Sequence, residues 1–323
     1  MSGLGLGLGL CLGAHRIVDR YGNMPATFSI PAEFANAGTK LINFSEPVTL
    51  TITGDVTLSI DGISYLSGET IPVATSEYHE LTINNPGEDA GTITFGKRKQ
   101  ITYLNLQNLG SFAITCDITG MKLTTLYLSV LGSSFITGDI TGMKITDLRL
   151  AYLGSSVITG DITGMKPTDL RLNNLGSSSA ITGDITGTDI TTLYLNNIGS
   201  SLTYGTNLLN ITNNLGIQLL GSTVFATDAE YEQLFIDAAA STWGNSTTRP
   251  LTITGSGKNF HRDYYDWGTF SATPGASSPT PSAIAIKLLV NRGTNPVVVT
   301  LEGISAYSYA GGFPENFENW WAE

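Results

Sequence analysis

A tandem repeat of 22 to 23 residues occupies the middle of the chain. Two of its clearest copies read LTTLYLSVLGSSFITGDITGMK, from Leu123, and ITDLRLAYLGSSVITGDITGMK, from Ile145. The first leucine of the LxL core recurs with spacings of 22, 22, 22 and 23 residues, at Leu104, Leu126, Leu148, Leu170 and Leu193. Fainter copies around Leu58, Leu81 and Leu215 extend the predicted repeat domain to residues 58–221. Self-similarity at a fixed short period is typical of architectures in which each copy packs only on its neighbours.

Each copy contains two stretches that favour extended backbone. In the LxL core the leucines point to one side of a strand, because side chains alternate along extended backbone. The second half, ITGDITGM, alternates isoleucine with polar residues, and β-branched Ile and Thr favour a second strand over a helix. The period and the LxxLxLxxL pattern are those of leucine-rich repeats. We therefore predict a mostly β, leucine-rich-repeat-like solenoid with 22–23-residue coils and a right-handed path.

Charge and cysteine content limit the classes of partner. Charged residues make up only 13% of the chain, and the formal net charge is −11. Binding to a phosphate backbone needs stripes of Lys and Arg, so nucleic acid is not expected as a partner. The neutral, hydroxyl-rich composition suits an extracellular or virion-type surface. Cys11 and Cys116 form neither a disulfide framework nor a zinc spacing, and Cys116 is predicted to be a buried free thiol.

Residues 1–20 contain the tract SGLGLGLGLCLG, from Ser2 to Gly13, in which glycine and leucine alternate. The tract lacks a basic start and is half glycine, which is unfavourable for a secretion signal, and it is too short to span a bilayer. In a strand, its leucines would share one side and bare backbone the other, so it could lie against another protein or pair with copies of itself. We predict an assembly anchor that acts through Leu4, Leu6, Leu8 and Leu10. A secretion or lipid signal and a disordered spacer are the alternatives.

The segments that flank the repeat predict smaller units. Residues 21–57 alternate apolar and polar side chains and are predicted to form a β segment that caps the open end of the solenoid. Residues 222–303 predict an α/β closing unit that begins with a helix capping box at Thr227 and Glu230, and continues with strands near 249–257 and 296–303 and a helix over 282–293.

Two aromatic-rich segments lie towards the end of the chain. The long loop 257–281 is rich in aromatic side chains and is a candidate contact segment. The tail 304–323 carries Trp320 and Trp321, which would be wasteful if exposed on a monomer, so they are predicted to pack on this chain or on a partner.

The outward-facing residues of the LxL strands form columns from coil to coil. The first column begins with Tyr103, and further columns place Tyr, Arg and Asn side chains beside one another on one sheet face. Aromatic faces and amides suit sugar or peptide recognition, whereas a solvated face with balanced Asp–Arg neighbours and Asn ladders is the alternative. The candidate binding residues are Tyr103, Asn105, Tyr127, Arg149, Tyr152, Arg171, Asn173, Asn174, Tyr194 and Asn196.

Known catalytic and metal-binding patterns are missing from the sequence. The return limb carries one aspartate per coil, including Asp117 and Asp139, which is too few oxygens for a Ca²⁺ cage. These aspartates are predicted to cap turns and to face a ladder of lysines. His15, His79 and His261 lie in unlike contexts, and no nucleophile, zinc or phosphate-loop motif accompanies them. We expect a protein that is not an enzyme and that needs no metal or cofactor. A glycan depolymerase that uses carboxylates of the sheet face is the enzymatic alternative.

The repeats with ITGDITG between LxL strands resemble the leucine-rich-repeat-like proteins of phages and prophages of Bacteroidota-type bacteria. The segment from ATDAEYEQLFIDAAASTWGN to VVVTLEG is similar to the unit that closes many of those proteins, and the start MSGLGLGLGL is similar to virion proteins of that group. The resemblance covers roughly residues 58–303. It implies a multicopy tail, fibre or head-decoration protein located in the virion, joined to other virion proteins by its N-terminal tract and touching host-surface glycan or protein. A secreted bacterial leucine-rich-repeat adhesin or effector is the alternative.

Overall fold

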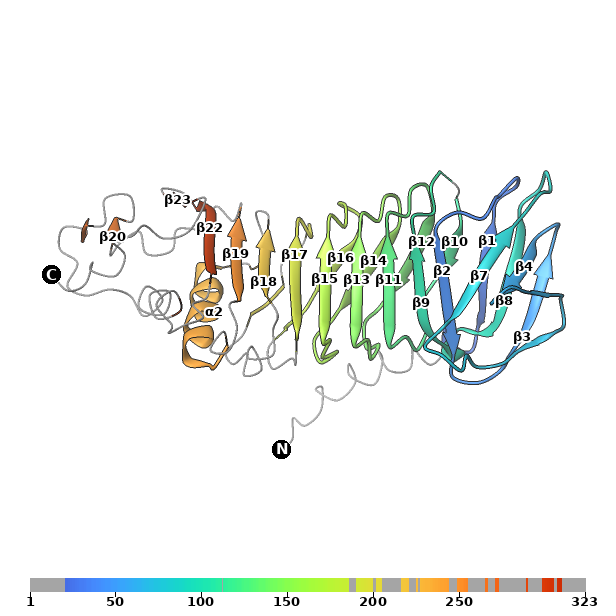
Figure 1. Cartoon of the computed structure of the whole chain (residues 1–323), viewed down its shortest axis with the longest axis horizontal. Helices are drawn as coiled ribbons and strands as arrows, with labels where there is room; N and C mark the ends of the chain where they lie inside the picture. Colours follow the sequence, from blue (N-terminus) through green and yellow to red (C-terminus); the bar gives the residue numbers. More distant parts are fainter. Residues whose placement is uncertain are drawn as a thin grey trace, which may run out of the picture. The chain divides into compact units, whose positions relative to one another are not determined.

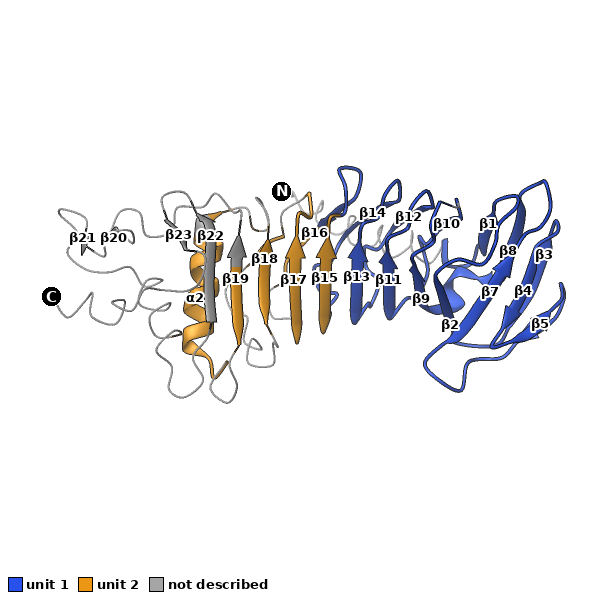
Figure 2. Ribbon diagram, turned by 45° about the horizontal axis from the view of Figure 1, so that its top comes forward, with its two compact units in different colours: residues 1–165, 175–181 blue, residues 166–174, 182–323 orange. Residues whose placement is uncertain are grey.

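The computed structural model describes residues 21–111, 113–185, 190–199, 202–204, 216–220, 225, 227–243, 249–254, 265–266, 271–272, 289, 298–304 and 307–309. It confirms a mostly β chain with a solenoid of about five turns, whose coils are roughly 22 residues apart. The chain divides into two compact units, coloured separately in Figure 2. The first comprises residues 1–165 and 175–181, and the second comprises residues 166–174 and 182–323.

The first unit begins with antiparallel strands that form a cap. These strands belong to two sheets. In one sheet the strand order is β6, β3, β8, β1, and in the other it is β5, β4, β7, β2. Apolar side chains of both sheets, such as Phe44 and Phe95 with ring centroids 5.8 Å apart, fill the space between them. The strands are β1 (Pro25–Ile30), β2 (Thr39–Phe44), β3 (Val48–Thr53), β4 (Thr57–Ile60), β5 (Ile63–Tyr65), β6 (Thr70–Ile71), β7 (His79–Asn84) and β8 (Gly91–Lys97).

The cap is larger than the sequence predicted. Leu58 and Leu81 were expected to begin coils of the solenoid, but their strands pair antiparallel with each other instead of stacking in parallel. The capping segment therefore reaches from residue 21 to about residue 100 rather than to residue 57. The prediction was wrong because a short LxI pattern is produced equally by an antiparallel strand with one buried face.

Parallel coils follow the cap in the first unit (Figure 1). After the short 3₁₀ helix η1 (Arg98–Gln100), β9 (Ile101–Gln107), β11 (Thr125–Ser129) and β13 (Asp147–Ala151) pair in register, so that Leu104, Leu126 and Leu148 stack as neighbours. The return strands β10 (Thr115–Asp117), β12 (Phe135–Asp139) and β14 (Val157–Asp161) form the other sheet. At the join with the cap, β9 pairs antiparallel with β2 and β10 with β1.

The interior of the coils is apolar and is closed by serines. Leu126, Leu128 and Leu131 are fully buried, as are Ile136 and Ile140, which confirms the predicted interior columns. A buried serine at the corner of each coil connects it to the previous one. The Ser156 hydroxyl donates to the Ser134 carbonyl at 3.0 Å and accepts the Ile136 N–H at 2.9 Å, and Ser179 continues the ladder. Each buried polar corner is thereby satisfied without water.

The second unit continues with parallel strands. β15 (Asp169–Asn173), β17 (Thr192–Asn196), β18 (Ile217–Leu220), β19 (Pro250–Thr254) and β22 (Val298–Ile304) follow one another, and β23 (Tyr307–Tyr309) is antiparallel to β22. The predicted strands near 249–257 and 296–303 are thus present, as extensions of the same sheet. β16 (Ala180–Thr182) lies where the chain passes between the two units, and β20 (Tyr265–Asp266) and β21 (Ser271–Ala272) pair as a short ribbon.

Helix α2 (Asp228–Ala240) begins at the predicted capping box, where the Thr227 N–H donates to the Glu230 carboxylate at 2.8 Å. Its apolar side has no exposed surface, as predicted for Tyr231, Leu234, Phe235 and Ala238. The predicted helix over 282–293 lies outside the described residues, apart from the buried Leu289. No helix among the described residues has the length and apolar character that crossing a bilayer requires.

A lysine is buried in the cap and makes stability depend on pH. Lys40 is 1% exposed, and its Nζ donates to the carbonyls of Ala37 and Gly38 at 2.5 and 3.2 Å. Burial lowers its pKa from 10.5 to about 8, against an opposing effect of Glu80. Between these two values the unfolded chain binds the proton that the folded chain has lost, so stability rises with pH. We expect wild type to gain up to about 3 kcal/mol relative to Lys40→Met between pH 7.5 and pH 10 in urea denaturation. A difference that stays constant with pH would contradict this.

Candidate functional site

The outward face of the parallel strands in the first unit carries a cluster built on Tyr127, Asp147 and Arg149. Register places Tyr127 of β11 directly beside Arg149 of β13. The Arg149 Nε and Nη2 donate to the two Asp147 oxygens at 3.0 and 3.1 Å, and the guanidinium lies 4.4 Å from the Tyr127 ring centre. The Tyr127 hydroxyl donates to the same carboxylate. Bidentate pairing and stacking together hold the guanidinium in one plane.

The environment of Tyr127 keeps its hydroxyl protonated. Burial raises the pKa of the phenol, and the hydrogen bond to Asp147 and that carboxylate's negative charge raise it further. The phenol therefore stays protonated and acts as a hydrogen-bond donor across the whole neutral range. The cluster therefore presents an aromatic ring beside a planar cation that the Asp147 carboxylate holds in place.

A row of aromatic rings leads from this cluster to the cap. The ring centroids of Tyr127 and Tyr103 are 6.0 Å apart, and those of Tyr103 and Tyr78 are 5.5 Å apart. Tyr78 is 39% exposed and was missed by the sequence reasoning, because it precedes β7, an antiparallel strand outside the repeat. No signal in the repeat alignment could have found it.

Two residues that were predicted to contact a ligand are buried and therefore inaccessible to one. Tyr103 is 6% exposed and Asn105 is 5% exposed, since Tyr78 and Tyr127 cover the tyrosine and Gln107 donates to the Asn105 side chain at 2.7 Å. The prediction treated each outward position as accessible, but neighbouring large side chains of a sheet face cover one another. Tyr103 and Asn105 support the aromatic row and do not form its surface.

On the face of the second unit, as in the Arg149–Asp147 pair of the first, polar side chains bond to one another, an arrangement that the balanced-charge alternative also predicts. Arg171 Nε and Nη2 donate to Asp169 at 2.8 and 3.0 Å, and the arginine side chain is 45% exposed. Asn196 donates to Asn173 at 2.9 Å, close to Tyr194, whose hydroxyl lies 3.5 Å from the Asn196 amide. Arg171, Asn173 and Asn196, which were predicted to contact a ligand, therefore already bond to side chains of the same face.

Two of the candidate binding residues, Tyr152 and Asn174, do not belong to the strands. Tyr152 and Asn174 follow their strands at coil corners, where the backbone has a positive φ of 48° and 47°. Tyr152 is 52% exposed, and Asn174 donates to Asn173 and accepts from Asn197 at 3.2 Å. Tyr152 is therefore an accessible aromatic side chain at the edge of the sheet face.

The equivalent corner in the preceding coil holds a valine under backbone strain. Val130 has a φ of 50° and is 45% exposed, whereas Asn108, Asn174 and Asn197 occupy the same corner elsewhere. Left-handed backbone is unfavourable for a β-branched residue, and asparagine tolerates it. We expect Val130→Asn to raise the free energy of unfolding by about 1 kcal/mol in urea denaturation. Val130→Thr keeps the β-branch and should give no gain. Equal effects of the two changes would contradict the strain argument.

The return limb confirms turn capping by aspartate. Asp117, Asp139 and Asp161 each accept the backbone N–H of the threonine two residues later, at 2.8–2.9 Å. Asp117 pairs with Arg98 at 2.7 Å, where the sequence predicted a lysine ladder. Burial opposes ionisation of Asp117, but its hydrogen bonds with Thr119 and its interaction with Arg98 hold the pKa below the usual value. In the described ranges, no group of three or more His, Cys, Asp or Glu side chains could hold a metal ion.

Of the three histidines, His79 lies among the residues that the structure describes, and both of its ring nitrogens have hydrogen-bond partners. The ring is 5% exposed, with Nδ1 2.7 Å from the Asp61 carboxylate and Nε2 2.9 Å from the Pro72 carbonyl. Both neighbours are acceptors, so this pair connects the β4–β5 turn to the loop before β7 and offers no nitrogen to a substrate. Cys116 is a buried free thiol, as predicted, and burial raises its pKa.

The predicted assembly residues Leu4, Leu6, Leu8, Leu10, Trp320 and Trp321 lie outside the described residues, as does most of the aromatic loop 257–281. No family model matches this chain, and neither a curated protein nor a solved structure shows significant similarity to it.

Proposed function

We propose that this protein is a non-enzymatic structural and adhesive component of a phage particle, attached through its N-terminal region and displaying a solenoid that contacts glycan or protein on a host surface. The observation that carries the adhesive part is the cluster of Tyr127, Asp147 and Arg149, with Tyr78 and Tyr152 exposed on the same unit. The particle assignment is supported by the sequence resemblance and by the low charge content of the chain.

The chemistry of the cluster favours a glycan. Tyrosine rings offer apolar faces against which the C–H groups of a sugar ring can pack, and a guanidinium offers planar donors to sugar hydroxyls. Because Asp147 already holds Arg149 in place, little side-chain entropy is lost when a ligand binds. One such face binds weakly, but many copies on one particle would bind a cell surface with high avidity.

Loss of the guanidinium should weaken binding. We expect Arg149→Ala to reduce binding of the full chain to its glycan on an array of bacterial surface polysaccharides by about tenfold, which corresponds to about 1.4 kcal/mol. Lys144→Ala is the matched control, because it removes one positive charge from an exposed position on the return limb and should bind as wild type does. Equal loss in both variants would show a charge effect, and no loss in either would remove this face as the binding surface.

The particle assignment needs a separate measurement. Mass spectrometry of purified particles should find this chain with Met1 or Ser2 retained at its N-terminus. The alternative, a secreted leucine-rich-repeat adhesin or effector, would instead be found outside particles and shortened at its N-terminus by export. Finding the shortened chain in the culture medium, and none in particles, would overturn the particle assignment and leave the adhesive face untouched.

A further inference from the structure

Strand β5 is an edge with no neighbour on one side. It is the last strand of its sheet in the first unit and pairs with β4 through Leu58 with Tyr65 and Ile60 with Ile63. Across the residues that the structure describes, no strand pairs with its other side. Ile63 and Leu66 are 63% and 71% exposed, the two highest values among the large apolar side chains of that part of the chain. An open edge with exposed apolar side chains is a template for a further strand.

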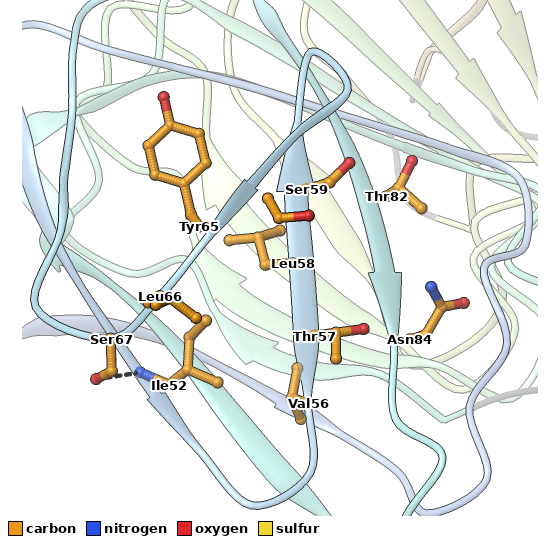
Figure 3. Close-up of a pocket in the computed structure, with 11 residues that line it drawn as sticks. Ile52, Val56, Thr57, Leu58, Ser59, Tyr65, Leu66, Ser67, Thr82 and Asn84 are labelled. Atoms are coloured by element: carbon orange, nitrogen blue, oxygen red, sulfur yellow. Dashed lines mark hydrogen bonds between the residues drawn. The ribbon is translucent and has the colours of Figure 1, made fainter.

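A pocket of about 420 Å³ lies beside this edge. Figure 3 shows Leu58 of β4, Tyr65 of β5 and Leu66, which form part of the lining of the pocket. Val56 and Leu58 are buried, so the apolar part of the lining belongs to the core of the cap. None of the lining residues is charged: they are Ile52, Val56, Thr57, Leu58, Ser59, Ser64, Tyr65, Leu66, Ser67, Thr82 and Asn84.

The chain itself contains a segment with matching chemistry. The tract GLGLGLGL, residues 3–10, alternates glycine with leucine, and Arg16 is the first Lys, Arg, Asp or Glu side chain of the sequence. In an added strand all four leucines would lie on one side, and the glycine side would let neighbouring backbone approach closely. We propose that this Gly-Leu tract adds as a strand to the free edge of β5 in its own cap, with leucine side chains entering the pocket beside Leu66.

The linking residues are long enough for this pairing. Gly22 packs beside Lys99, where a Cβ would lie 3.2 Å from the lysine Cβ, so the described chain begins near the start of β9. From β9 the sheet passes through β2, β7 and β4 to β5, which is four strand spacings or about 19 Å. Residues 11–20 span at most about 34 Å when extended, which exceeds this distance. The tether therefore holds the tract at a high effective concentration near its own β5, and a second copy would have to compete with that.

Such pairing would cover two surfaces that otherwise promote aggregation. The open edge and the leucine side of the tract would each promote aggregation if they stayed exposed on the free protein. The tract would stay paired with β5 until another protein offers a strand edge that binds it more tightly. This is compatible with the N-terminal attachment proposed above but does not depend on it.

Disulfide trapping in the full chain tests the pairing. In a Cys11→Ser background, Ile63→Cys is combined in turn with Leu4→Cys, Leu6→Cys and Leu8→Cys, and Cys116 stays buried. After mild oxidation we expect a bridge within single chains in at least one pair, detected by non-reducing peptide mapping of the monomer. Lys144→Cys in place of Ile63→Cys is the control and should form none. Absence of a bridge in all three pairs, or bridges only between two chains, would overturn the proposal.

Hydrogen exchange gives an independent readout without cysteines. Replacing Leu4, Leu6, Leu8 and Leu10 by serine in the full chain should speed exchange of the Ser64 backbone amide by about tenfold or more. In the pairing of β4 with β5 this amide points to the free edge, where its strand partner would be lost. The amides of β7, inside the same sheet, serve as the internal reference and should be unchanged. Equal protection of the Ser64 amide in wild type and variant would contradict the pairing.

Discussion

Gly132→Ala should prevent stable folding of the first unit or lower its free energy of unfolding by more than 3 kcal/mol. Gly132 forms the corner after β11 and has a φ of 62°. A Cβ at this position would overlap the carbonyl oxygen of Gly110 in the preceding coil, far inside van der Waals contact. Because that oxygen belongs to the backbone, it cannot move away as the end of a flexible side chain would. Steric overlap therefore adds to the cost of left-handed backbone, which is about 1–2 kcal/mol.

The control for this change is Gly142→Ala. Gly142 also has a positive φ, of 75°, but nothing lies within 4 Å of the Cβ that the substitution would add. It should cost only the backbone term, about 1–2 kcal/mol, in the same urea denaturation. If the two variants are equally destabilised, the close approach of Gly132 and Gly110 is not what makes glycine necessary at this corner.

Leu148→Ala should destabilise the protein by about 3–5 kcal/mol. Leu148 is fully buried and stacks on Leu126 in the parallel register of β11 and β13. Its removal leaves a cavity between coils, and parallel strands that pair on both sides have little freedom to close it. Denaturation by urea, followed by far-ultraviolet circular dichroism, measures the loss.

Leu148→Met separates cavity formation from a change of residue type. Methionine conserves the volume and adapts to the site, so this variant should lose less than about 1.5 kcal/mol. A loss below 1 kcal/mol for the alanine variant would show that the coils relax around the gap, contrary to the tight packing of the column.

The parts of the fold that could be read from the sequence are those that repeat. The 22-residue spacing places Leu126 beside Leu148, and the observed register is the predicted one, because stacking identical coils is the arrangement in which every leucine meets a leucine. The return limb as a strand, the turn-capping aspartates and the capping box of α2 rest on local chemistry and were predicted correctly for that reason.

The candidate site was predictable only in part. The outward positions of Tyr127 and Arg149 follow from alternation, but their accessibility depends on which neighbours cover them. Tyr103 is covered by Tyr78, a residue from the cap that no repeat alignment could place. Sequence therefore identified the face, and tertiary packing selected which of its side chains remain available.

By itself, the sequence determined the coil length, the two-stranded coil and the buried columns, because these follow from short-range periodicity and side-chain volume. Only the tertiary structure decided that the segments around Leu58 and Leu81 belong to an antiparallel cap, and that β5 ends a sheet beside an apolar pocket. The physical reason is that strand direction and strand neighbours are set by long-range hydrogen bonding, and an LxI pattern is the same in parallel and antiparallel strands.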